Sequence, residues 1–139
     1  MNESETSQRL TTALRKDCKC IIFKIHGHGM QQPGIPDFYI ATGKVEAWIE
    51  TKGPTTILTP LQHIVIGQLK RHNVRVFVLR FEKERTFVFE DEEGSMLAQY
   101  SFTTWKNCAE QFLIVLHTLC GVGEFTCGAG ASEVLPHST

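Results

Sequence analysis

The spacing of apolar and polar residues predicts a chain in which helices alternate with strands. Residues 3–16 carry a narrow apolar stripe at helical spacing, and Asn2 with Glu5 fits the capping box that begins a helix. Two more helices are predicted, one from a Thr59 cap to about residue 73 and one over residues 105–119. Runs rich in β-forming residues predict the strands, which are residues 20–25, 37–41, 45–52, 74–81, 86–89 and 96–102.

The strand at residues 45–52 has two chemically different faces. Val45, Ala47 and Ile49 fall on one face because side chains alternate along a strand. The other face carries polar and aromatic residues, namely Glu46, Trp48, Glu50 and Lys52. The short turn at residues 42–44 predicts that this strand forms a hairpin with residues 37–41.

The order of the elements predicts an α/β fold. A helix between the strands at residues 45–52 and 74–81 favours a parallel crossover, and the hairpins favour antiparallel pairs beside it. We therefore expect a mixed central sheet flanked by helices, with a hairpin and a helix added at the C-terminal end. Residues 1–120 are predicted to form a single domain, and the Gly- and Ala-rich residues 121–139 a flexible tail.

Composition is that of an ordinary water-soluble domain, with 42% hydrophobic and 21% charged residues in 139. No apolar run reaches the length of a membrane span, and the acidic start lacks the pattern of a signal peptide, so we expect a cytoplasmic protein. The net charge of −1 counts against a nucleic-acid-binding role. However, residues 44–80 hold six basic residues against two acidic ones, which allows a locally positive face.

Three polar positions are predicted to meet at one edge of the sheet. Glu50 and Lys52 lie two residues apart on a strand and therefore point to the same face. Asp37 begins the neighbouring strand, and the hairpin brings that start close to the end of the strand with Glu50. Asp37 alone is also compatible with a simple turn residue, and Glu50 with Lys52 is compatible with a solvated pair.

Two carboxylates in one place repel each other, and a hard divalent cation would offset that repulsion. Mg²⁺ typically takes one or two carboxylates together with waters and phosphate oxygens. A bound cation acidifies water, and a lysine beside it can stabilise the charge that develops on a phosphate. Asp37, Glu50 and Lys52 are therefore predicted to form a site for phosphodiester hydrolysis.

Three further residues are candidates with a simpler reading beside each. Gln62, three residues after the Thr59 cap, either reaches the site or only closes the capping box of its helix. Lys24 at the end of the first strand either approaches a phosphate of DNA or lies in solvent. His26, in a glycine-containing loop, either faces DNA or has no role.

The segments that carry this chemistry resemble the VRR-NUC branch of the PD-(D/E)XK nucleases. The resemblance covers about residues 3–80 and rests on three motifs, Gly34-Ile35-Pro36-Asp37-Phe38, Trp48-Ile49-Glu50-Thr51-Lys52-Gly53-Pro54 and Leu58-Thr59-Pro60-Leu61-Gln62. It implies a restriction-endonuclease-like core and a Mg²⁺-dependent site, for which Mn²⁺ is expected to substitute. No organic cofactor and no membrane partner is expected.

The resemblance also implies further ligands and a substrate. The family uses a glutamate of the first helix near the metal, for which Glu5 is favoured over Glu3, although Glu5 is also compatible with a capping role alone. The backbone carbonyl of Thr51 would be another ligand. The compact size is similar to stand-alone bacterial or phage members that resemble Holliday-junction resolvases. That likeness implies a homodimer that cuts branched DNA inside a bacterial or phage-infected cell.

Two other functions remain open from the sequence. One is a restriction-type or repair endonuclease on the same core, and the other is a DNA-binding module without catalysis. The acidic residues 82–93 take no part in the predicted chemistry and are interpreted as a solvated hairpin end. The apolar helix at residues 105–119 suits either core packing or a dimer surface.

Overall fold

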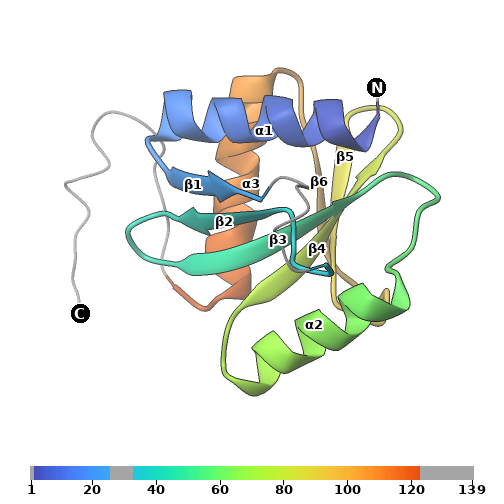
Figure 1. Ribbon diagram of the computed structural model, residues 1–139. Helices are drawn as coiled ribbons and strands as arrows, with labels where there is room; N and C mark the ends of the chain where they lie inside the picture. The colour runs from blue at the N-terminus through green and yellow to red at the C-terminus, as the bar shows by residue number, and fades with distance from the viewer. Residues whose placement is uncertain (1, 26–32, 123–139) are drawn as a thin grey trace.

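The computed structural model describes residues 2–25 and 33–122. They form one mixed sheet of six strands with helices on both faces (Figure 1). The elements in chain order are α1 (Glu3–Cys18), β1 (Ile21–Lys24), β2 (Phe38–Ala41), β3 (Glu46–Lys52), α2 (Pro60–Arg71), β4 (Val76–Glu82), β5 (Thr86–Glu90), β6 (Met96–Ser101) and α3 (Trp105–Leu119). Each predicted helix and strand is present, and the expected α/β class with a mixed sheet is confirmed.

The strands lie in the order in which they occur along the chain, β1 to β6. Neighbouring strands pair antiparallel except β3 and β4, which are parallel and are joined by the crossover through α2. In the parallel pair Glu50 lies opposite Val78, and Lys52 lies opposite Arg80. Because β3 ends at Lys52 and the chain then leaves for α2, polar side chains collect at this edge of the sheet.

Local signals account for the helix boundaries. Asn2 and Glu5 form the capping box of α1, and Lys19 ends that helix in the left-handed region at φ 59°. Thr59 caps α2 with Gln62 as its capping-box partner, and Pro60 occupies the first turn. After α3 the chain turns at Gly121 with φ 74°, a conformation that glycine adopts without strain.

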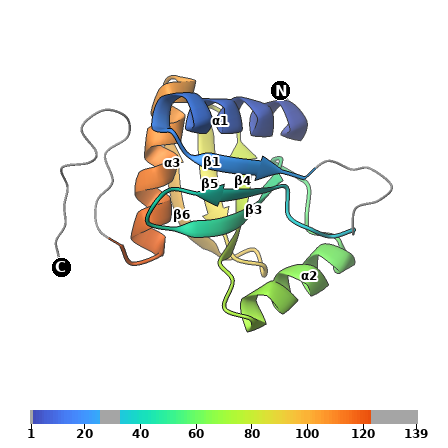
Figure 2. The ribbon, with the colours of Figure 1, turned by 60° about the vertical axis from the view of Figure 1, so that its left-hand side comes forward.

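The main core lies between the sheet and the pair α1 and α3, which cover the same face (Figures 1 and 2). Phe112, Leu113 and Leu116 of α3 are fully buried there, so this helix serves core packing. The β5 and β6 strands contribute Phe87, Phe89 and other aromatic residues to the same core. The C-terminal hairpin and helix are thus integral to the fold rather than additions to a finished domain.

Helix α2 covers the opposite face with a much smaller core. Ile66 packs there against Val76 and Val78 of β4, and Trp48 lies at its border. Leu61 and Ile64, which the sequence places on the apolar side of this helix, are 43% and 55% exposed. The buried residues of this helix are Val65 and Ile66, so its buried side is set by tertiary packing and not by periodicity alone.

Two acidic residues of the 82–93 segment make ion pairs instead of being merely solvated. Lys70 of α2 contacts Glu92 at 2.6 Å, and Arg80 of β4 contacts Glu90 at 3.0 Å. These pairs fasten the β5 end of the sheet to α2 and β4. The predicted flexible tail beyond residue 122 lies outside the described residues, and among those described no helix has the length and hydrophobicity to cross a bilayer.

Candidate active site

The β2–β3 register brings the predicted carboxylates together. Phe38 pairs with Ile49, so Asp37, one residue before Phe38, lies opposite Glu50. Lys52 shares the strand face of Glu50, and its Nζ lies 3.7 Å from Glu50 Oε2. The structure therefore assembles Asp37, Glu50 and Lys52 at the end of β3, as the strand pattern predicts.

Asp37 is held by the residue between the other two. One carboxylate oxygen, Oδ2, accepts a hydrogen bond from the backbone amide of Thr51 at 2.8 Å and a second from the Thr51 hydroxyl. Among the described residues, the other oxygen accepts no hydrogen bond. The sequence predicted a role only for the backbone carbonyl of Thr51. The contact of its hydroxyl with Asp37 was missed, because a threonine within a strand carries no signal for a partner 14 residues away.

Glu50 is the most deeply buried of the charged residues in the site, with 3% of its surface exposed. Burial and the nearby charge of Asp37 raise the pKa of its carboxyl, and Lys52 opposes the shift, so that the pKa is about 8. Its Oε2 accepts a hydrogen bond from the Gln62 side chain at 3.1 Å. Its Oε1 is buried and accepts no hydrogen bond from the described residues.

Gln62 makes both contacts that the sequence allows. Its Oε1 accepts from the Thr59 amide at 2.9 Å and closes the capping box of α2. Its amide nitrogen donates to Glu50. The two readings are compatible because a glutamine side chain has an acceptor and a donor at the same end.

The two acidic residues at the start of α1 are placed differently. Glu5 Oε1 accepts from the amide of Asn2 at 3.1 Å, so this carboxylate is used for helix capping. Glu3 instead lines a pocket of about 340 Å³ together with Lys24, Asp37 and Thr51. The structure thus brings Glu3, and not Glu5, to the cluster.

Lys24 lies in the same pocket, at the end of β1 beside Asp37. Partial burial lowers the pKa of its ammonium, the Asp37 charge counteracts that effect, and Arg15 adds to it. His26, the other candidate for DNA contact, lies outside the described residues.

Comparison with known families places this arrangement in context. Residues 1–82 match the model of the VRR-NUC domain, a range that contains Asp37, Glu50, Lys52 and Gln62. The chain belongs to the VRR-NUC family. It is therefore a member of the PD-(D/E)XK class of nucleases, which is what its three motifs resemble. Comparison with curated proteins gave no match.

A solved structure supports the VRR-NUC fold. The chain is similar to Hjc of Archaeoglobus fulgidus, described as a Holliday junction resolvase from an archaeal hyperthermophile. The TM-score is 0.51 at 15% identity, over 65% of this chain and 77% of that chain. At such identity the likeness concerns the fold. It agrees with the helix-flanked mixed sheet described above.

The donor set of the VRR-NUC site suits a hard divalent cation. The described residues hold no group of three or more Asp, Glu, His or Cys side chains in metal-binding proximity. Mg²⁺ does not need one, because it usually binds one or two carboxylates and keeps waters and phosphate oxygens. The buried Oε1 of Glu50 has no hydrogen-bond partner in residues 2–25 and 33–122 and is an acceptor that a cation would satisfy. Oxygen donors alone argue against a thiolate-type zinc centre.

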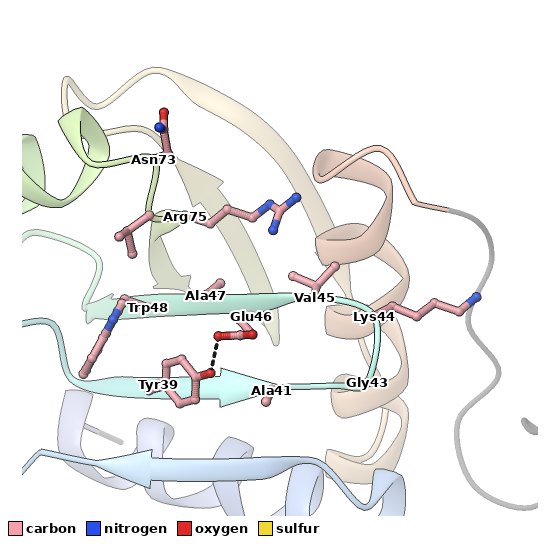
Figure 3. Close-up of a pocket in the computed structure, with 11 residues that line it drawn as sticks. Tyr39, Ala41, Gly43, Lys44, Val45, Glu46, Ala47, Trp48, Asn73 and Arg75 are labelled. Carbon is pink, nitrogen blue, oxygen red and sulfur yellow. Dashed lines mark hydrogen bonds between the residues drawn. The ribbon is translucent and has the colours of Figure 1, made fainter.

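Another pocket lies at the opposite end of β3. It has a volume of about 620 Å³ and is lined by residues of the β2–β3 hairpin and of the segment before β4, including Tyr39, Glu46, Trp48 and Arg75. Figure 3 shows the Tyr39 hydroxyl donating to Glu46 at 2.6 Å across the two strands. Among the described residues, its lining holds one acidic side chain, that of Glu46. The candidate active site is thus chosen for its pair of carboxylates, Asp37 and Glu50, and not for the volume of a pocket.

Proposed function

We propose that this protein is a divalent-cation-dependent DNA endonuclease that cuts Holliday junctions as a homodimer. The observation that carries the proposal is the meeting of Asp37, Glu50 and Lys52, with Glu50 Oε1 buried and without a partner among the described residues. Membership of a nuclease family supports the interpretation of these residues as a site for phosphodiester hydrolysis.

The residues divide into cation ligands and supporting groups. Asp37, Glu50 and the carbonyl of Thr51 would hold Mg²⁺, or Mn²⁺ in its place, and Glu3 takes the position that the sequence gave to Glu5. Bound there, the cation would acidify a water and offset charge on the scissile phosphate. Lys52 provides an ammonium beside the reacting phosphate, and Gln62 fixes the orientation of Glu50.

Branched DNA is the proposed substrate class because of the fold and the symmetry that resolution requires. The similar structure is that of a protein described as a Holliday junction resolvase. A four-way junction has two equivalent strands to cut, and a dimer with two-fold symmetry presents two identical sites to them. Lys24, together with basic residues of the 44–80 segment, would contact the backbone phosphates.

Cleavage of a labelled four-way junction in Mg²⁺, with linear duplex and a flap alongside, tests this proposal. We expect paired symmetric cuts in the junction by the native chain and none by Asp37→Asn. The asparagine retains an oxygen that accepts the two Thr51 hydrogen bonds, so this variant is expected to fold normally. Equal cutting of the linear duplex would contradict the junction assignment. Binding without cleavage in Mg²⁺ or Mn²⁺ would favour a non-catalytic module.

A further inference from the structure

Arg80 of β4 joins four acceptors behind the candidate active site. Its Nε and Nη2 donate to the two carboxylate oxygens of Glu90 at 3.0 and 3.2 Å. Its Nη1 donates to the backbone carbonyls of Gly53 and Thr56, each at 2.6 Å. Arg80 pairs in register with Lys52, so the guanidinium spans the turn that immediately follows the catalytic strand.

The same turn is connected to the start of α1. The hydroxyl of Thr56 accepts from the Gly53 amide at 2.9 Å and donates to Glu3 Oε2 at 2.6 Å. This contact joins residues 53 positions apart in the sequence. Gly53 also packs closely, since a Cβ atom added there would lie 3.3 Å from Glu3 Cγ. Glu3 is therefore held from one side by the turn and lies beside Asp37 and Thr51 on the other.

We propose that Arg80, clamped by Glu90, is a positioning residue that fixes the turn at residues 53–56 and, through Thr56, orients Glu3 toward the cation site. The inference rests on the proposed cation-dependent function but assigns roles to residues outside the nuclease motifs. Glu90 even lies beyond the residues that match the family model.

The physical reason lies in the position of Glu3. It is the first residue of α1 and a flexible side chain, so without a partner its carboxylate would sample several rotamers in solvent. A hydrogen bond from a hydroxyl that is itself fixed removes much of that freedom. Arg80 is suited to fix the turn because its planar guanidinium, with five N–H donors, serves two carbonyls and both oxygens of a carboxylate, whereas an ammonium has only three N–H donors for these four acceptors. Groups that orient metal ligands in this way typically change metal affinity by roughly 10–100-fold when removed.

The decisive comparison is Thr56→Val against Thr55→Val, measured as the Mg²⁺ dependence of the melting temperature without DNA. Both substitutions remove one hydroxyl from an exposed residue of the same turn. Thr56→Val leaves the backbone carbonyl for Arg80 intact and removes only the link to Glu3 and Gly53. We expect the Mg²⁺ concentration for half-maximal stabilisation to rise roughly 10-fold in Thr56→Val and to stay unchanged in Thr55→Val. Thr56→Ser, which restores the hydroxyl, should return the value toward that of the native chain.

A second variant, Arg80→Lys, separates positioning from general stability. It keeps a positive charge facing Glu90 but cannot serve four acceptors. We expect the same rise in the Mg²⁺ requirement, seen both in melting and in cleavage rate, with a larger effect at low Mg²⁺ than at saturation. A lower melting temperature with an unchanged Mg²⁺ requirement would show a merely structural role and overturn the inference, as would Thr56→Val behaving like the native chain. No Mg²⁺ response in the native chain would instead refute the proposed function, and this inference with it.

Discussion

Helices α1 and α3 cover one face of the sheet with a continuous apolar core, whereas α2 covers part of the other face with few buried side chains. The first face contains large aromatic residues such as Phe87 and Phe112, both fully buried. The second face carries Glu50 and Lys52, which are charged side chains and nearly as inaccessible. Burying charge costs stability, so the second face can be maintained only because the first supplies the necessary free energy.

The largest effect is expected from Glu50→Gln, which changes the face that carries the charged residues. Cleavage should fall by about a thousandfold or more, because the variant loses the carboxylate that we propose as a cation ligand while it keeps the shape of the side chain. The stability of the variant, by contrast, should exceed that of the native chain at high pH. The raised pKa of Glu50 means that its contribution to stability is present below pH 4.5 and is lost as pH rises through about 8. In EDTA, the melting temperature of Glu50→Gln relative to that of the native chain should increase as pH rises from 5 to 9. A constant gap would contradict this account.

Phe112→Ala should destabilise the face of the sheet that α1 and α3 cover. It removes a fully buried ring from the main core and should lower the free energy of unfolding by about 3–5 kcal/mol in denaturant titrations. Ile114→Ala on the same helix is the control, since Ile114 is 46% exposed and should cost under about 1 kcal/mol. Cleavage per folded molecule should be unchanged in both. A specific loss of cleavage in Phe112→Ala would mean that the two faces are not separable.

Gln62 allows a smaller and finer test, because one side chain serves both the helix cap and Glu50. Gln62→Ala should reduce cleavage roughly tenfold and stability by about 1 kcal/mol. Gln62→Glu keeps an acceptor for the Thr59 amide but sets a negative charge against Glu50. It should therefore retain the cap and lose more cleavage than Gln62→Ala. The opposite ranking in single-turnover assays would assign Gln62 to capping alone.

The smallest effect is expected from His117, a buried residue of α3 whose contribution to the unfolding free energy should depend on pH. Its Nδ1 donates to the Leu113 carbonyl at 2.6 Å, and its Nε2 lies 2.8 Å from the Thr42 hydroxyl. Burial lowers the pKa of this imidazole, the Leu113 contact opposes the shift, and Lys44 adds to it. Its stabilising contribution is therefore present above pH 6.5 and is lost as pH falls through the lowered pKa. The difference in unfolding free energy between the native chain and His117→Gln should shrink as pH falls from 7.5 to 5. A difference that does not change with pH would exclude this titration.

The sequence predicted the elements and the central carboxylates because both depend on local patterns. Each of these patterns is encoded within a few neighbouring residues. They are the helix caps at Asn2 and Thr59, the alternation of side chains along β3 and the short turn before that strand. Asp37, Glu50 and Lys52 follow from that alternation and from one hairpin register.

Contacts between distant segments could not be predicted in the same way. The choice between Glu3 and Glu5 was decided by the capping box, which uses the Glu5 carboxylate and leaves Glu3 for Thr56. The Arg80 contacts join β4, β5 and the turn after β3, so no local periodicity signals them. The capping signature at Asn2 was itself the evidence that Glu5 was already used.

The packing of α1 against α3 has a consequence for the order in which the protein matures. Asp37, Glu50, Lys52 and Gln62 all precede residue 63, so they are synthesised early. Yet α1, which presents Glu3, shares its core with α3, the last helix of the described chain (Figure 1). A nascent chain that has not yet released α3 from the ribosome lacks the surface on which α1 rests. The position of Glu3 beside Asp37 therefore depends on a helix that is synthesised after the candidate site residues, and we expect the proposed site to be complete only once α3 has packed against α1.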